Sequence, residues 1–266
     1  KLLLTGEYVV LDGAEALALP CKFGQSLKVK PLKGHQFQWT SYLKNGEVWQ
    51  DLKFSLEDVL KPSKPEDFKT RLFQILKVIY QFKPNLFDQT YAFSTHLGFD
   101  KNWGLGSSST LINNLATWAR IDAYDLLAQT FGGSGYDIAA AKMQSPFIYR
   151  RNGKQVFIKE TEIAESLKPH IYFVYLNQKQ NSREAITAYR KISPKQQQDS
   201  IKTISELTHV IANTSDLKTF EKLLSHHEQI LSKLIKQTPV QNLRFKDYKA
   251  GVVKSLGAWG GDFVLV

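Results

Sequence analysis

The chain has 266 residues, 42% of them hydrophobic and 23% charged, a composition that excludes a disordered protein and allows one large or two modest domains. No apolar run is long enough to span a membrane, and the single cysteine, Cys21, excludes an internal disulfide and fits a reducing cytoplasm. The formal net charge of +10 favours anionic partners, which include both phosphorylated small molecules and nucleic acid.

The opening of the chain alternates between apolar runs and turn residues, a pattern typical of short strands. Asp12-Gly13 is a turn signal, and Lys44-Asn-Gly46 is a hairpin signal. The sequence predicts strands at Lys1–Leu11, Ala16–Cys21, Leu27–Pro31 and Gln36–Tyr42. We therefore expect the chain to open with a β-meander.

Helical periodicity begins near Pro65, where apolar residues recur every three or four positions as far as Phe82. Thr90–Leu97 then alternates as a strand does. Further helices are predicted directly after residue 106, at Ala123–Thr130, and around residues 201–211 and 217–234, and further strands at Pro146–Arg150, Gln155–Ile158, His170–Leu176 and Gly251–Ser255. This mixture predicts an α+β fold and not a doubly wound parallel sheet.

The stretch Asn102-Trp-Gly-Leu-Gly-Ser-Ser-Ser-Thr110 leads directly into a helical pattern. Gly104 and Gly106 allow a tight turn and a close approach to a ligand, and the start of a helix favours an anion. The stretch predicts a phosphate-binding loop, although an ordinary Gly/Ser loop has the same composition. It matches neither the Walker A loop nor the G-x-G-x-x-G fingerprint. We expect Trp103, beside the loop, to pack against protein rather than on an adenine.

Two further glycine-rich stretches lie around residues 133 and 260, and the first of them carries a carboxylate, Asp137. Phosphoryl transfer needs a group that accepts or orients a hydroxyl proton, and cations around the phosphates. Asp137 is the candidate base, and Lys1, on a predicted strand, is the candidate cation that would help to orient it. The six histidines show no metal-ligand spacing, and at most one of the adjacent His226 and His227 is expected to face the core.

Three segments resemble, in family order, the motifs of the GHMP small-molecule kinases, the superfamily of galactokinase, homoserine kinase, mevalonate kinase and phosphomevalonate kinase. Motif 1 is Lys1–Leu11, motif 2 is Gly104–Thr110 and motif 3 is Lys254–Asp262. Gly135-Tyr-Asp-Ile-Ala139 further resembles the branch called GYDIA-type GHMP kinases. The resemblance therefore extends over the whole chain.

This resemblance implies a two-domain fold, with a domain like ribosomal protein S5 domain 2 over residues 1–168 and a ferredoxin-like GHMP kinase domain over residues 169–266. It implies a cytoplasmic kinase that uses ATP and Mg²⁺. By position, Asp137 and Lys1 would be catalytic. The ATP phosphates would be held by Gly104, Leu105, Gly106, Ser107, Ser108 and Ser109, with Ser108 also a ligand of Mg²⁺.

The same resemblance places the acceptor against Glu7, Tyr8, Ser182, Arg183, Gly260 and Gly261. The planar fork of Arg183 suits a carboxylate or a phosphate, although an arginine on a helix surface is an equal interpretation. Mevalonate kinases carry a glutamate, as a second Mg²⁺ ligand, on the helix before the catalytic motif. Here the corresponding turn reads Leu126-Leu-Ala-Gln129, and Asp125 is the nearest carboxylate.

The mevalonate and phosphomevalonate branch is closest in appearance, and its anionic acceptors agree with a basic chain. Two alternatives stay open: a sugar or homoserine kinase of the same fold, and a non-enzymatic basic module that binds nucleic acid. The lysines are dispersed and form no arginine-rich run, so we expect neither a nucleic-acid nor a membrane partner. A homodimer is left open.

Overall fold

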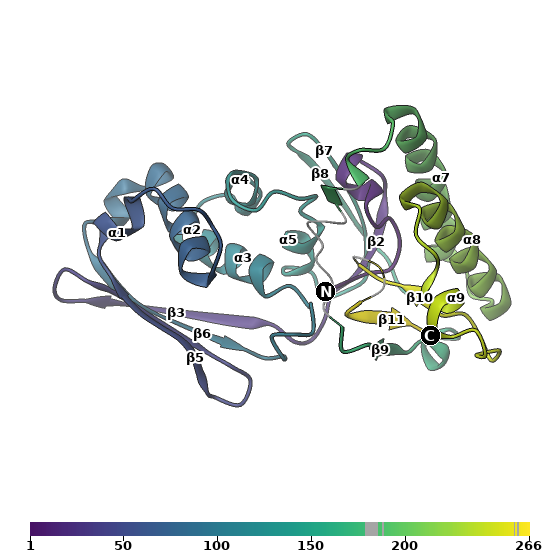
Figure 1. The fold of residues 1–266 in the computed structure, drawn as a ribbon, viewed down its shortest axis with the longest axis horizontal. Coiled ribbons are helices and arrows are strands. Elements are labelled where there is room, and N and C mark those ends of the chain that lie inside the picture. The colour runs from purple at the N-terminus through teal and green to yellow at the C-terminus, as the bar shows by residue number, and fades with distance from the viewer. Residues whose placement is uncertain (179–185, 188, 258, 260) are drawn as a thin grey trace. The chain divides into compact units, whose positions relative to one another are not determined.

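A computed structural model of the chain describes residues 1–178, 186–187, 189–257, 259 and 261–266. The chain packs as two compact units (Figure 1). Unit 1 contains Lys1–Cys21, Asn102–Gly104 and Lys142–Val266, and unit 2 contains Lys22–Lys101 and Leu105–Ala141. The units divide the chain differently from the two implied domains, whose boundary at residue 168 stays a prediction.

Unit 2 is built on a four-stranded sheet of order β3-β6-β4-β5. Its strands are β3 (Gln25–Leu32), β4 (Phe37–Tyr42), β5 (Val48–Phe54) and β6 (Thr90–Leu97). β6 pairs antiparallel with β3 and parallel with β4, and β4 forms an antiparallel hairpin with β5. Alternation along β4 buries Phe37 and Trp39 on one face, while Gln38 is exposed on the other.

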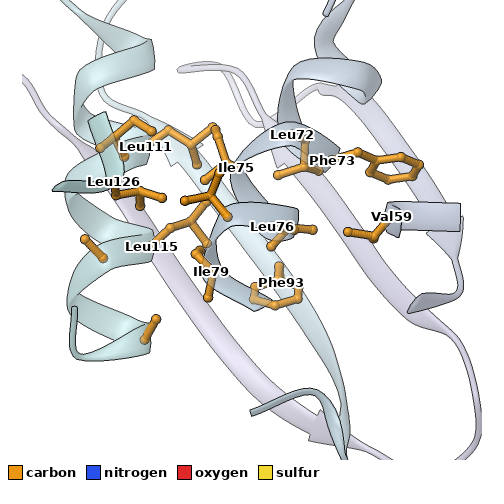
Figure 2. Close-up of a cluster of buried hydrophobic side chains, with 14 of the residues drawn as sticks. Val59, Leu72, Phe73, Ile75, Leu76, Ile79, Phe93, Leu111, Leu115 and Leu126 are labelled. Carbon is orange, nitrogen blue, oxygen red and sulfur yellow. The ribbon is translucent and has the colours of Figure 1, made fainter. Parts of the chain in front are cut away.

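Helices cover one face of this sheet, and their apolar sides form the core of unit 2 (Figure 2). They are α1 (Leu56–Leu60), α2 (Phe68–Phe82), α3 (Ser107–Ala119), α4 (Ala123–Gln129) and α5 (Tyr136–Ala140), with a 3₁₀ turn η2 (Pro84–Phe87). α2 begins at a capping box, in which Asp67 and Thr70 satisfy each other's backbone N–H groups. Ile75 and Ile79 of α2 share this core with Phe93 of β6, and burying each such side chain contributes about 1.5–3 kcal/mol.

Unit 1 contains two antiparallel sheets of order β1-β2-β7-β8 and β10-β11-β9. The first sheet consists of β1 (Leu2–Leu3), β2 (Ala16–Leu19), β7 (Phe147–Asn152) and β8 (Gln155–Glu160). The second consists of β9 (Phe173–Tyr175), β10 (Lys254–Ser255) and β11 (Phe263–Leu265). Two 3₁₀ turns, η1 (Val9–Asp12) and η3 (Lys168–His170), complete the described connections.

The helices of unit 1 are α7 (Pro194–Asn213), α8 (Leu217–Ile235) and α9 (Val240–Arg244). α7 and α8 are amphipathic, and Ile211 of α7 and Leu224 of α8 pack into one core with Leu17 of β2. In the described part of the chain, no helix combines the length and the apolar character needed to cross a bilayer.

The predicted α+β class is confirmed, but the predicted opening is wrong in two respects. Lys1–Leu11 is not one strand, because the pairing ends at Leu3 and a 3₁₀ turn occupies Val9–Asp12. The opening is not a meander either, because β6 inserts between β3 and β4, and β2 pairs with β7. Strand partners that lie far away in sequence override the local hairpin pattern.

Candidate active site

The loop of motif 2 turns through two glycines with left-handed backbones, Gly104 at φ 66° and Gly106 at φ 95°. Gly106 is the N-cap of α3, which begins at Ser107. The first N–H groups of any α-helix have no acceptor within the helix, and the helix dipole places partial positive charge at the same end. The start of α3 therefore has the electrostatic character of an anion site.

The four hydroxyl residues at this helix start divide into two pairs. Ser109 Oγ donates to the Gly106 carbonyl at 2.9 Å, and Thr110 Oγ1 lies 2.9 Å from Gln25 Oε1 of β3. These two hydroxyls brace the turn. For Ser107 and Ser108 the structure gives no side-chain hydrogen bond within the described residues, and Ser108 is exposed. Ser108 therefore has the accessible oxygen that its predicted role as a Mg²⁺ ligand requires.

Asp137 lies in the first turn of α5, which begins at Tyr136 directly after Gly135, whose φ is 83°. It is half-buried, and its Oδ1 accepts from the Ile138 N–H at 3.1 Å. Ile138 itself is buried in the core of unit 2 together with Ile112 and Leu115 of α3. Packing of α5 against α3 thus holds the candidate base and the helix start of motif 2 on neighbouring helices of unit 2. Lys1 belongs to unit 1, so its predicted pairing with Asp137 stays a prediction.

Gly104 has no room for a side chain. A Cβ at this position would lie 2.3 Å from Oδ2 of Asp262, the last residue of motif 3. The backbone of Asp262 is fixed beside β9, because its N–H donates to the Gln178 carbonyl at 2.6 Å and its carbonyl accepts from Leu176 at 2.8 Å. The end of motif 3 therefore contacts the first glycine of motif 2 within unit 1.

Trp103 packs against protein, as predicted. Its ring centroid lies 6.2 Å from those of Tyr175 and Phe263, in strands β9 and β11. This aromatic contact anchors the entry to the loop on the smaller sheet of unit 1.

Glu7 of motif 1 is buried, with 1% of its surface exposed, and its Oε1 accepts from Lys254 Nζ at 2.5 Å. Lys254 is the first residue of motif 3 and is also fully buried. Burial raises the pKa of the Glu7 carboxyl from 4.5 to about 7, and the positive charge of Lys254 opposes this rise. The side chain of Glu7 thus faces another motif, and its predicted contact with the acceptor stays a prediction.

Two neighbouring residues of α8, His227 and Glu228, complete this buried group. His227 Nε2 accepts from the Gly6 N–H at 3.0 Å, and Glu228 Oε1 accepts from the Ser255 N–H at 3.1 Å. Burial, with the charge of Lys254, holds the pKa of His227 well below its ordinary value, so the ring is neutral. His227 is buried and His226 exposed, which confirms that only one of the two faces the core.

Sequence reasoning missed Lys254, His227 and Glu228 as a group. The available signal was their position, since Glu228 lies between Leu224 and Leu231 on the apolar side of α8, and Lys254 directly follows two valines in the predicted strand Gly251–Ser255. A charged residue at a core position needs a partner. The sequence could not say which partner, because Glu7 lies 247 positions from Lys254.

The Tyr8 side chain is buried in a cluster that includes Tyr189 and Trp259 of motif 3. The Tyr8 and Tyr189 rings lie 5.9 Å apart between centroids. Tyr8 Oη and Trp259 Nε1 are buried and make no hydrogen bond to any described residue. Buried polar atoms normally have partners, so these two groups have unused capacity to bind a ligand or water.

Among the other predicted acceptor residues, Gly261 is buried in unit 1, whereas Ser182, Arg183 and Gly260 lie outside the described residues. Asp125 lies in the first turn of α4. Within the described ranges no three His, Cys, Asp or Glu side chains are grouped as metal ligands.

No protein-family model matches this chain, and neither does any curated protein sequence. Solved structures do match it across almost its whole length. A Lin0012 protein from Listeria innocua has 17% identity and a TM-score of 0.73, with 99% of this chain and 87% of that chain covered. Galactokinase from Lactococcus lactis, solved with galactose, has 13% identity and a TM-score of 0.72, with 99% and 82% covered.

Mevalonate kinase from Methanococcus jannaschii has 16% identity and a TM-score of 0.65, with 100% of this chain and 87% of that chain covered. At such identities the likeness is one of fold. The chain has the α+β fold that this galactokinase and this mevalonate kinase share.

Proposed function

We propose that this protein is an ATP- and Mg²⁺-dependent kinase that transfers the γ-phosphoryl group of ATP to a small anionic acceptor. The observation that carries the proposal is the loop with left-handed Gly104 and Gly106 at the start of α3, in a chain with the GHMP kinase fold. Backbone N–H groups at a helix start bind phosphate oxygens without needing a charged side chain. The Walker A and Rossmann fingerprints are therefore not required.

In the proposed reaction an acceptor oxygen attacks the γ-phosphorus, the bond to the β–γ bridging oxygen breaks, and ADP leaves. Asp137 orients the acceptor and takes its proton, while the N–H groups at the start of α3 and the ammonium of Lys1 stabilise the charge on the phosphoryl oxygens. Bound Mg²⁺ would neutralise phosphate charge, with the exposed Ser108 hydroxyl as one oxygen ligand. The protein contributes mainly positioning and electrostatics.

For the acceptor, mevalonate or phosphomevalonate is the first candidate. The basic composition and the appearance of motif 1 and of the Gly-Tyr-Asp137 segment support it. The likeness to a galactokinase makes a sugar the second candidate. Tyr8 Oη and Trp259 Nε1, buried without a hydrogen-bond partner among the described residues, are donors that a polar acceptor of either kind would satisfy.

A coupled assay of ADP release tests the proposal, with mevalonate, phosphomevalonate, homoserine and galactose as acceptors and with Mg²⁺ present or chelated. We expect turnover with one of them and a rise of the thermal midpoint on adding Mg²⁺-ATP. Asp137→Asn should lower kcat by about 10²- to 10⁴-fold. The matched control is Asp199→Asn, because Asp199 is an exposed aspartate of α7.

Two results together would refute the kinase proposal: Mg²⁺-ATP does not shift the thermal midpoint, and Asp137→Asn changes the turnover of none of the acceptors. Salt-sensitive binding to a nucleic acid, together with that failure, would favour the non-enzymatic alternative.

A further inference from the structure

Unit 1 contains a buried group of charged side chains that takes no part in the proposed chemistry. Glu7, His227 and Lys254 have at most 1% of their surface exposed, and Glu228 has 4%. The group joins three separate parts of the chain, namely motif 1, helix α8 and the first residue of motif 3. We refer to these four residues as the buried charge cluster.

The bonds of the cluster end on backbone groups of the two motifs. His227 Nε2 binds the Gly6 N–H at 3.0 Å, and Glu228 Oε1 binds the Ser255 N–H at 3.1 Å. Lys254 Nζ closes the group by donating to Glu7 Oε1 at 2.5 Å and to the Ser255 carbonyl at 2.8 Å. α8 therefore fixes the backbone of motif 1 and of motif 3 through one connected set of bonds.

The residue that follows Glu7 has an unusual backbone. Tyr8 adopts φ 66° and ψ −56°, and the Val9 N–H donates to the Glu7 carbonyl at 2.8 Å. These are the dihedral angles and the bond of a γ-turn with positive φ, a rare and strained conformation. A bulky residue keeps such a backbone only where its surroundings hold it in place. Gly6 and Glu7 are held by the cluster, and the Tyr8 ring by Tyr189.

Stability alone is a weak reason for these charges. Lys254 lies between two carboxylates, with its Nζ 3.9 Å from Glu228 Oε2, and desolvating three ions offsets much of their attraction. Apolar side chains of the same volume would fill the space as well or better. They could not bind the N–H groups of Gly6 and Ser255, which need acceptors when buried. The cluster is therefore polar because its side chains accept hydrogen bonds from these two buried N–H groups.

We propose that the buried charge cluster is a positioning device, which holds the Tyr8 turn and the start of motif 3 in place so that the acceptor meets a preformed surface. The inference rests on the proposed function, because it requires that Tyr8 and motif 3 contact the acceptor. Glu7, His227, Glu228 and Lys254 are positioning residues in this account. Tyr8 and Trp259, with their unused buried donors, are the groups positioned.

The test replaces the ion pair by a neutral pair of similar shape, Glu7→Gln with Lys254→Met. The matched control is Glu165→Gln with Lys168→Met, an exposed ion pair in the same unit with side chains 85% and 53% exposed. The quantities to be measured are the thermal midpoint with and without Mg²⁺-ATP, the KM of the acceptor and of ATP, kcat, and the hydrogen-exchange rate of the Val9 amide.

We expect the neutral pair to keep the midpoint shift with Mg²⁺-ATP and to raise the acceptor KM by roughly tenfold or more, with the ATP KM changed by less than about twofold. The Val9 amide, which closes the turn, should exchange at least about tenfold faster. The exposed control should change none of these quantities. A merely structural role would lower the midpoint and leave the acceptor KM unchanged.

The inference is overturned if the folded neutral pair has the wild-type acceptor KM and Val9 exchange rate. If the neutral pair does not fold, His227→Phe alone replaces it, because this change removes the acceptor of the Gly6 N–H and leaves the Glu7–Lys254 pair in place. An unchanged acceptor KM in that variant overturns the inference equally. Failure of the proposed function looks different, since the wild-type protein would then show neither turnover nor a midpoint shift with Mg²⁺-ATP.

Discussion

Lys254→Met removes the cation that lies between Glu7 and Glu228, and its effect on stability should depend on pH. In the wild-type protein burial raises the pKa of Glu7 from 4.5 to about 7, so the folded state holds this proton more tightly than the unfolded chain does. The resulting stability is full below pH 4.5 and is lost as the pH rises to about 7. Because one pKa unit corresponds to about 1.4 kcal/mol, the rise from 4.5 to about 7 corresponds to a loss of about 3.5 kcal/mol.

The charge and the hydrogen bond of Lys254 oppose the effect of burial on Glu7. Without them the pKa of Glu7 moves higher, so the protein continues to lose stability as the pH rises above 7. Glu228 responds in the same direction, because burial raises its pKa and Lys254 opposes that rise. Breaking a buried pair in this way costs about 3–5 kcal/mol, which we expect near pH 8. Near pH 5.5, where Glu7 is largely protonated in both proteins, the difference should fall to about 1 kcal/mol.

The assay is urea unfolding at both pH values, followed by the fluorescence of the five tryptophans. Lys168→Met is the control, because its exposed pair with Glu165 should contribute at most about 1 kcal/mol at either pH. His227 also titrates, but it is present in both proteins. Loss of the Lys254 charge raises the lowered pKa of His227, which makes the variant relatively more stable at low pH. The effect of His227 therefore has the same direction as the effect of Glu7. An equal destabilisation at both pH values would show that the lost packing of the lysine stem, and not its charge, is responsible.

Two further predictions concern the loop of motif 2. Gly104→Ala and Gly132→Ala both place alanine at φ 66°, which costs about 1 kcal/mol of stability. Only at Gly104 does the new Cβ collide with Asp262, so calorimetry should show the larger loss of stability for Gly104→Ala. The midpoint shift with Mg²⁺-ATP should likewise disappear in Gly104→Ala alone, and equal behaviour of the two variants would refute the close contact. Ser108→Ala should raise the Mg²⁺ concentration needed for half-maximal activity, whereas Ser109→Ala, which removes a bond to the loop backbone, should mainly lower stability by about 1 kcal/mol. If the Mg²⁺ requirement of Ser108→Ala is that of the wild type, Ser108 is not a ligand.

The elements predicted well are those whose signals are local. The stripe that ends at Phe82 forms α2, the alternation at Thr90–Leu97 forms β6 with the same bounds, and the glycine-serine stretch does lead into a helix. In each case the periodicity agrees with the face that the core buries. The capping box of α1 at Ser55 was an equally local signal that sequence reasoning overlooked.

The elements predicted badly depend on distant partners. Lys1–Leu11 has the composition of a strand, yet Glu7 must turn inward to reach Lys254, and the chain leaves the sheet after Leu3. The order β3-β6-β4-β5 likewise depends on a pairing between residues about sixty positions apart, which hairpin rules do not anticipate. Such choices are decided by burial in the complete fold and not by the segment itself.

The strained backbones of the described residues gather in the motifs. The non-glycine residues with positive φ are Tyr8, Arg120, Asn177, Lys236, Trp259 and Asp262. Arg120 and Lys236 are the C-caps of α3 and α8, where this conformation is ordinary. The other four are Tyr8 in motif 1, Asn177 two residues after β9, and Trp259 and Asp262 in motif 3. Asn177 and Asp262 are of residue types that adopt this conformation comparatively often, whereas Tyr8 and Trp259 are bulky residues that keep it only where the surrounding structure holds them. Because such outliers cluster at functional sites, Tyr8 and Trp259 are the positions at which the proposed contact with the acceptor is best tested.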